Sequence, residues 1–350
     1  MSYNKRFICM KVITILAFLL IFQPGFGQYD FSSVDQLLQR NLKQLGGNVV
    51  AMVYKDGKIV YQKEFGEFNA KTQAPVASCS KWLTAALVMT FVDQGKLDLD
   101  EPVSKYIPSF SKYMKNYVTL RHCLSHTTGI EREGGRASKL LERRKYQSLE
   151  EEANAIAAKE ISNNPGMEFF YGNYGLNIAA RVCEVVGKKA FERLIQERIT
   201  RPLRMRGTSF TNDDGSAPNP SGGARSTAND YMNFLVMILN KGVFENKKIL
   251  SEEAIAEMLK VQNGNLPVKW TPKVAEGFEY GLGAWIQEKD ESGKTIVVSS
   301  PGLFGTWPYV DLCRKYAAII FVKSILSEQK KDLAMQFKDI VESEIGACKQ

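Results

Sequence analysis

A serine followed three residues later by a lysine occurs three times after the first 30 residues, starting at Ser78, Ser109 and Ser327. On a helix, residues with this spacing lie one turn apart on the same face. An amine in that position can activate the hydroxyl as a nucleophile or hold a neighbouring oxyanion. The motif alone therefore predicts a serine nucleophile without choosing among the three copies.

The surroundings of the three copies differ. Ser78 leads into the run Trp-Leu-Thr-Ala-Ala-Leu-Val-Met at 82–89, which predicts a helix over 80–94 that is buried on all sides and stops at Gly95. Ser109 lies in a polar segment that predicts a loop, and Ser327 begins a charged helix, where serine is a typical N-cap. Ser78 and Lys81 are thus the preferred pair. The alternative is that Ser78 only caps its helix while Lys81 extends toward solvent.

Histidine is scarce, because the chain contains only His122 and His126. Their i, i+4 spacing could place two zinc ligands on one helix face, but no third ligand is indicated. A Ser-His-Asp triad would need one of these two histidines. The chain also lacks the Gly-x-Ser-x-Gly segment that carries the serine in many such enzymes. We therefore expect lysine to act as the base, His126 to stabilise the loop at 127–129, and no metal or cofactor.

Several landmarks follow Ser78 in a fixed order. Residues 76–81 and then 95–103 resemble the serine β-lactamase and penicillin-binding-protein-like hydrolase family, closest to its class C branch. Residues 124–130 resemble the next landmark of that family, and Tyr-Gly-Asn at 171–173 resembles its Tyr-x-Asn motif. The resemblance continues to Tyr-Gly-Leu-Gly at 280–283 and covers nearly the whole chain after residue 27.

This resemblance implies a role for each matching residue. Ser78 is the nucleophile, Lys81 activates it, and the Tyr171 phenol passes a proton to the leaving group. Asn173 offers its amide to Lys81 or to the substrate. A second Tyr-x-Asn at 231–233 lies in a helical pattern and is interpreted as core.

The third family motif, Lys-Thr-Gly or His-x-Gly, is the point of departure. The matching triplet is Ser-Pro-Gly at 300–302, so Ser300 stands where the family carries a cation or an imidazole. Gly302 completes the triplet, and the resemblance assigns the oxyanion hole to the N–H groups of Ser78 and Leu303. A neutral hydroxyl binds a carboxylate less strongly than a charged donor does. We therefore predict weak or absent β-lactam turnover and a preference for neutral esters or amides.

Three functions follow from these residues. The first is a serine hydrolase that forms an acyl-enzyme on an ester, amide or D-peptide bond of a small-molecule or peptide substrate. The second is a β-lactamase or a peptidoglycan D-peptidase. The third is a non-catalytic binding protein on the same fold, which the missing third-motif cation motivates.

The first 27 residues are typical of a bacterial signal peptide. Lys5, Arg6 and Lys11 flank an apolar run at 12–22, and small residues precede a cleavage site after Gly27. The run is too short to span a bilayer core of about 30 Å as a helix. We expect a periplasmic or secreted protein with no stable membrane span; an uncleaved N-terminal anchor is the alternative.

Charge and cysteine content exclude other classes. Removing the leader removes three basic and no acidic residues, so the net charge falls from +8 to +5 without a concentrated basic patch, and no nucleic-acid partner is expected. Five widely spaced cysteines remain, without a Cys-x-x-Cys pair. They do not resemble a disulfide framework, although a single disulfide bridge remains possible.

Three tryptophans have two possible roles. Trp270, Trp285 and Trp307 are interpreted either as pocket residues or as core.

Strand patterns occur at both ends of the chain and helical patterns between them. A hairpin is predicted around Asp56 and Gly57, strands over 280–287, 295–299, 309–312 and 316–322, and a last helix over 328–345. The predicted fold class is α/β (α+β): one antiparallel sheet from both chain ends, covered by the terminal helices on one face and by a mostly helical insert on the other. Residues 28–350 would form one catalytic domain, with an α/β part at 28–75 and 275–350 and a helical part at 80–265. The active site would lie in the cleft between the two parts.

Overall fold

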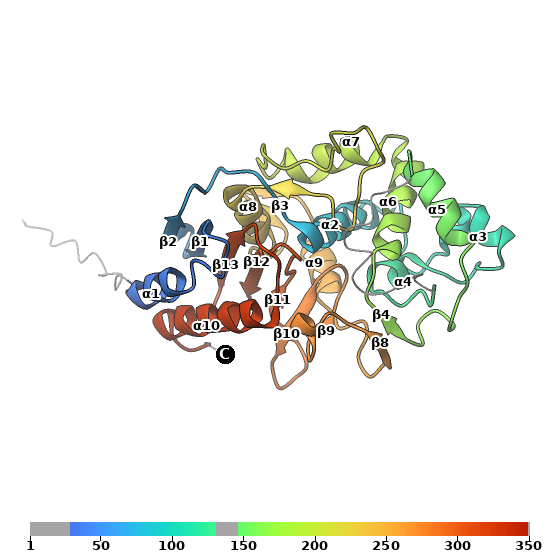
Figure 1. The fold of residues 1–350 in the computed structure, drawn as a ribbon. Helices are drawn as coiled ribbons and strands as arrows, with labels where there is room; N and C mark the ends of the chain where they lie inside the picture. The colour runs from blue at the N-terminus through green and yellow to red at the C-terminus, as the bar shows by residue number, and fades with distance from the viewer. Residues whose placement is uncertain (1–28, 131–145, 349–350) are drawn as a thin grey trace, which may run out of the picture.

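A computed structural model of the protein describes residues 29–130 and 146–348 (Figure 1). The predicted leader, residues 1–27, lies outside the described residues. Within the described ranges, no helix is both long and apolar enough to cross a membrane.

A seven-stranded antiparallel sheet forms the centre of the fold, with strand order β2-β1-β13-β12-β11-β10-β9. Strands from the two ends of the chain therefore pair directly, and Val50 in β1 lies opposite Phe321 in β13. The strands of this sheet are β1 (Val49–Lys55), β2 (Lys58–Phe65), β9 (Glu279–Tyr280), β10 (Trp285–Lys289), β11 (Thr295–Ser299), β12 (Trp307–Asp311) and β13 (Tyr316–Val322).

Ten α-helices in the described part of the chain surround this sheet or extend beyond it. They are α1 (Ser32–Arg40), α2 (Ser80–Val92), α3 (Ser109–Lys112), α4 (Leu120–Leu124), α5 (Leu149–Ala157), α6 (Tyr174–Gly187), α7 (Phe191–Ile195), α8 (Ala228–Leu239), α9 (Glu252–Met258) and α10 (Glu328–Ile345). Shorter elements near the site are η1 (Ala77–Cys79), η5 (Lys273–Ala275), β4 (Phe169–Phe170) and β8 (Val268–Trp270).

The β1–β2 turn has the backbone predicted for a tight hairpin. Asp56 and Gly57 have φ angles of 49° and 82°. Two successive positive φ angles are typical of a type I′ turn, whose twist matches that of the flanking strands. Aspartate tolerates this conformation and glycine adopts it without a steric penalty.

Both faces of the sheet are covered. Because successive strand residues point to opposite faces, Val49 and Ala51 pack in the core beneath α1 and α10. Val50 and Met52 belong to the larger core on the other face, which α8 covers. Figure 1 shows α1 and α10 side by side along one edge of the molecule, with the helices α3 to α6 gathered at the opposite end and α7 along the top of the view. The predicted fold class is confirmed.

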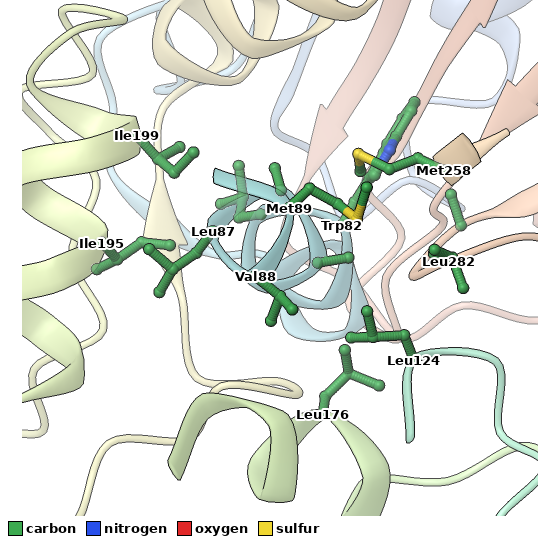
Figure 2. Close-up of a cluster of buried hydrophobic side chains, with 14 of the residues drawn as sticks. Trp82, Leu87, Val88, Met89, Leu124, Leu176, Ile195, Ile199, Met258 and Leu282 are labelled. Atoms are coloured by element: carbon green, nitrogen blue, oxygen red, sulfur yellow. The ribbon is translucent and has the colours of Figure 1, made fainter. Parts of the chain in front are cut away.

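Helix α2 is buried on all sides, as its apolar sequence predicted. Every residue from 80 to 91 is buried. Figure 2 shows its side chains enclosed by residues from α4, α6, α7, α9 and neighbouring segments, among them Leu124, Leu176, Ile195, Ile199, Met258 and Leu282. The helix ends shortly before Gly95, whose φ is 64°. The N-terminus of α2 is therefore held rigidly beside the sheet.

The strand predicted over 280–287 is wrong in one respect, because it is interrupted between β9 and β10. Gly283 in the interruption has a φ of 83°. A Cβ atom at this position would lie 2.5 Å from Ala85 Cβ and 2.8 Å from the main-chain oxygen of Lys81. The break thus lets the edge of the sheet approach α2 directly beside Lys81.

Candidate active site

Ser78 lies in η1, the turn that leads into α2. The preceding residue, Ala77, has a φ of 47°, a left-handed conformation that residues other than glycine seldom adopt. Such strain persists only where surrounding contacts hold it, and it clusters at functional sites. The buried Tyr231 hydroxyl donates to the main-chain oxygen of Cys79 at 2.8 Å and anchors the turn. Tyr231 is thus a core residue, as predicted for the second Tyr-x-Asn.

Three oxygen atoms surround the amine of Lys81. Its Nζ lies 3.3 Å from Ser78 Oγ, 3.1 Å from Asn173 Oδ1 and 2.7 Å from the main-chain oxygen of Ser221. Lys81 is 1% exposed. The alternative in which Lys81 extends toward solvent is therefore wrong, and the arrangement is suited to moving a proton to and from the serine hydroxyl.

The other two Ser-x-x-Lys segments differ from this pair. Ser109 begins α3, so the predicted loop is wrong, and its hydroxyl is buried. Ser327 is the N-cap residue of α10, as predicted, but its side chain makes no capping bond. Lys330 donates instead to Ser324 Oγ at 2.6 Å. Among the three segments, a hydrogen bond between the first serine and the lysine of the motif itself is found in the described structure for Ser78 and Lys81.

Tyr171 lies next to Lys81. It follows β4, and its N–H donates to the main-chain oxygen of Trp270 at 3.1 Å. Lys81 Nζ lies 4.9 Å from the centroid of the Tyr171 ring. Asn173, two residues later, is the N-cap residue of α6. The start of α6 therefore brings both predicted residues to the lysine.

His126 packs against Tyr171 and binds the main chain beside it. The Gly172 N–H donates to His126 Nδ1 at 3.4 Å, so the ring proton lies on Nε2, which is 3.1 Å from the Tyr280 hydroxyl. The rings of His126 and Tyr171 have centroids 4.6 Å apart. His122 instead accepts from the Thr119 N–H at the start of α4. Among the described residues, no group of three potential metal ligands lies together.

Ser300 lies beside the predicted nucleophile. It is 2% exposed, and its hydroxyl donates to the main-chain oxygen of Ser78 at 3.3 Å. The Ser300 side chain therefore ties the end of β11 to the turn around Ser78.

Gly302 and Leu303 continue this edge of the site. A Cβ atom on Gly302 would lie 2.2 Å from the main-chain oxygen of Val76, so only glycine fits this approach. Leu303 lines the same cleft as Ser78, and its main-chain oxygen accepts from the Leu326 N–H at 2.6 Å. The structure thus brings all seven residues singled out from the sequence to one region.

The residues that bind and position the Lys81 amine through the main chain of Ser221 were missed in the sequence analysis. The main-chain oxygen that binds Lys81 belongs to Ser221, which is fully buried. Asn177 accepts the Ser221 N–H at 3.1 Å and donates to the buried Glu152 at 2.8 Å. The available signal was the position of Asn177, one helical turn after Asn173 on α6.

A cleft of about 690 Å³ opens in front of Ser78. Tyr171, Trp270 and Trp285 line it as a group of packed rings, and Leu303 also belongs to the lining. Trp307 lies in the core under α10 instead. Two of the three tryptophans are thus pocket residues.

The cysteines do not compete with Ser78 as nucleophiles. Burial raises the pKa values of the Cys79, Cys123 and Cys183 thiols, so their thiolate forms are disfavoured. Cys313 and Cys348 form a disulfide with Cα atoms 5.4 Å apart. This is the single bridge that the sequence left open.

Comparison with known proteins agrees with this geometry. Residues 34–336 match the model of the Beta-lactamase family. The chain therefore belongs to the Beta-lactamase family, and it is a serine hydrolase of that family. The resemblance inferred from its motifs is confirmed.

Individual relatives are more distant. The chain is 25% identical over 305 residues to the D-alanyl-D-alanine-carboxypeptidase/endopeptidase AmpH of Escherichia coli K12, with 77% of each chain covered. A solved structure from Bacteroides dorei, described as of the β-lactamase type, is 30% identical with a TM-score of 0.81 and covers 91% of this chain and 99% of its own. The octameric penicillin-binding protein homologue of Pyrococcus abyssi is 21% identical with a TM-score of 0.73, covers 89% and 78%, and shares the fold.

Proposed function

We propose that the chain is an exported hydrolase that forms an acyl-enzyme on Ser78 and cleaves an ester, amide or D-peptide bond. One observation carries this proposal: the Lys81 amine lies 3.3 Å from Ser78 Oγ inside a buried set of oxygen acceptors. Asn173 Oδ1 and the Ser221 carbonyl oxygen accept two N–H bonds of this amine. When this amine is neutral, its nitrogen lone pair is therefore available to accept the proton of the Ser78 hydroxyl.

The chemistry follows from this arrangement. Ser78 Oγ attacks the carbonyl carbon of the substrate while its proton passes to Lys81. The N–H groups of Ser78 and Leu303 stabilise the oxyanion. Tyr171 gives its phenolic proton to the leaving group and recovers one from Lys81. Water then attacks the acyl ester, and the proton path runs in reverse to restore Ser78.

A fluorophosphonate probe tests the nucleophile. We expect the mature protein to be labelled at one site and Ser78→Ala to lose all labelling. The matched control is Ser109→Ala, which removes the serine of another Ser-x-x-Lys segment and should label at the wild-type rate. Labelling that survives in Ser78→Ala would contradict the proposal, and absence of labelling in the wild type would favour a binding protein.

Two features support export. The first 27 residues are typical of a cleaved leader, and a disulfide such as Cys313–Cys348 persists in oxidising compartments. N-terminal sequencing of the protein from a bacterial periplasm or medium should begin at Gln28. A cytoplasmic protein that retains Met1 and free thiols at Cys313 and Cys348 would contradict export.

A peptidoglycan D-peptidase is the second candidate, and the relative AmpH favours it because that protein's name states such an activity. The neutral Ser300 at the third motif argues against tight binding of a terminal carboxylate. Digestion of D-alanyl peptides and cell-wall fragments separates the two candidates. Release of D-alanine faster than hydrolysis of neutral aryl esters would establish the peptidase.

A further inference from the structure

The cleft in front of Ser78 is apolar along most of its lining. One wall is a stack of aromatic rings in which Tyr171 lies 4.9 Å from Trp285 and 6.1 Å from Trp270, measured between centroids. The lining also carries aliphatic and proline side chains, namely Pro272, Val274, Pro301, Leu303 and Leu326.

Among the residues that the structure describes, two charged side chains belong to the lining, Lys273 and Glu328. They form an ion pair with each other at 2.9 Å and are largely exposed, 72% and 60% respectively. Because this exposed pair carries no net charge, a carboxylate placed against the aromatic wall would lose hydration without meeting an excess of positive charge in the lining. The cleft therefore favours a neutral substrate.

The walls of the cleft are held in place by the fold. Trp270 ends β8, which pairs in parallel with β4, and its main-chain oxygen accepts the Tyr171 N–H. Lys331 of α10 donates to the main-chain oxygen of Glu276 at 3.2 Å and lies over the Phe278 ring. The η5 segment is thereby fastened to the start of α10. A preformed cavity of this kind binds apolar groups without first ordering its own walls.

We propose that this cleft binds a bulky apolar substituent of a neutral ester or amide, and that Trp270 determines the preferred size of that substituent. This inference rests on the proposed function, because it places the apolar substituent next to the carbonyl that Ser78 attacks. The volume of about 690 Å³ far exceeds what an acetyl group fills. Burial of each added methylene against these walls should raise kcat/KM about three- to fourfold.

Hydrolysis of p-nitrophenyl esters by the mature chain tests the inference. From acetate through butyrate to hexanoate, we expect kcat/KM to rise by at least tenfold in total, and the anionic glutarate monoester to be at least tenfold slower than hexanoate. Trp270→Ala should lower the hexanoate-to-acetate ratio of kcat/KM by at least fivefold, and Trp270→Phe by less. Tyr117→Ala, which removes an exposed aromatic ring outside the cleft lining, should leave the ratio unchanged.

A second measurement does not depend on turnover. Ser78→Ala protein should bind hexanamide at least tenfold more tightly than acetamide, as measured by tryptophan fluorescence. Trp270→Ala in that background should reduce this ratio by at least fivefold. Equal binding, or a flat ester series, would overturn the apolar cleft. Ester hydrolysis that survives in Ser78→Ala would instead contradict the proposed function, so the two failures are distinguishable.

Discussion

The hydroxyl of Ser300 donates to the main-chain oxygen of Ser78 at 3.3 Å. The motif resemblance places Ser300 where the family carries a cation or an imidazole, and in the structure this short neutral side chain contacts the chain's own backbone. The contact stabilises the turn that carries the nucleophile and leaves no positive charge at that position.

Weak or absent β-lactam turnover follows from this contact. A hydrogen bond from a charged donor is worth about 1–1.5 kcal/mol more than one from a neutral donor, which corresponds to a factor of about five to ten in kcat/KM. We expect a chromogenic cephalosporin to be hydrolysed at least fivefold less efficiently than neutral aryl esters, measured as kcat/KM on the same preparation. Efficient penicillin hydrolysis by the purified protein would contradict this.

Asn177 should act as a positioning residue for Lys81. It holds the Ser221 N–H, and the carbonyl oxygen of Ser221 binds the lysine amine. Asn177→Ala should lower kcat about ten- to a hundredfold with little change in KM, because a displaced carbonyl misplaces the amine. The unfolding free energy should fall by about 1–3 kcal/mol, since a buried N–H loses its acceptor.

The control for that variant is Asn233→Ala. Asn233 makes a comparable side-chain bond, donating to the main-chain oxygen of Leu203 at 2.9 Å in the α8 region. It should lose stability without loss of kcat. Similar kcat losses in both variants would indicate a general structural effect instead of positioning.

The buried cysteines should resist alkylation. Burial raises the pKa of the Cys79 thiol, so the reactive thiolate is scarcer at pH 8 than for an exposed cysteine. Treatment of the native enzyme with iodoacetamide at pH 8 should leave activity and the mass of the Cys79 peptide unchanged. The same treatment in denaturant should modify it. Rapid native alkylation of Cys79 with parallel loss of activity would contradict this.

The Cys313–Cys348 disulfide should stabilise the fold without affecting the site. It closes a loop with a sequence separation of 35 residues, for which the chain-entropy relation gives about 4 kcal/mol. It joins the β12–β13 turn to the C-terminus, at the end of β12 remote from Ser300 and Leu303. Dithiothreitol should lower Tm and leave kcat/KM for an aryl ester unchanged below the transition. The Cys313→Ser/Cys348→Ser variant should show the lower Tm with or without the reductant.

Local patterns were sufficient for much of the fold. The Asp56-Gly57 turn, the strands over 295–299 and 316–322, and the helix over 328–345 were predicted with their observed bounds. Each depends on turn chemistry or on side-chain periodicity within a few residues. The broken strand at Gly283 was missed because its cause is contact with Lys81 and Ala85 on α2, about 200 residues earlier in the chain.

The same division holds for the site. The sequence by itself determined that Ser78 and Lys81 share the start of a buried helix, and that the third motif has a neutral Ser300. Only the tertiary structure decided that the Ser221 carbonyl binds Lys81, that the Ser300 hydroxyl turns to the Ser78 backbone, and that Trp270 faces the cleft. Main-chain carbonyls look alike in every residue, and their direction depends on backbone angles set by distant contacts. No local pattern of side chains records that direction.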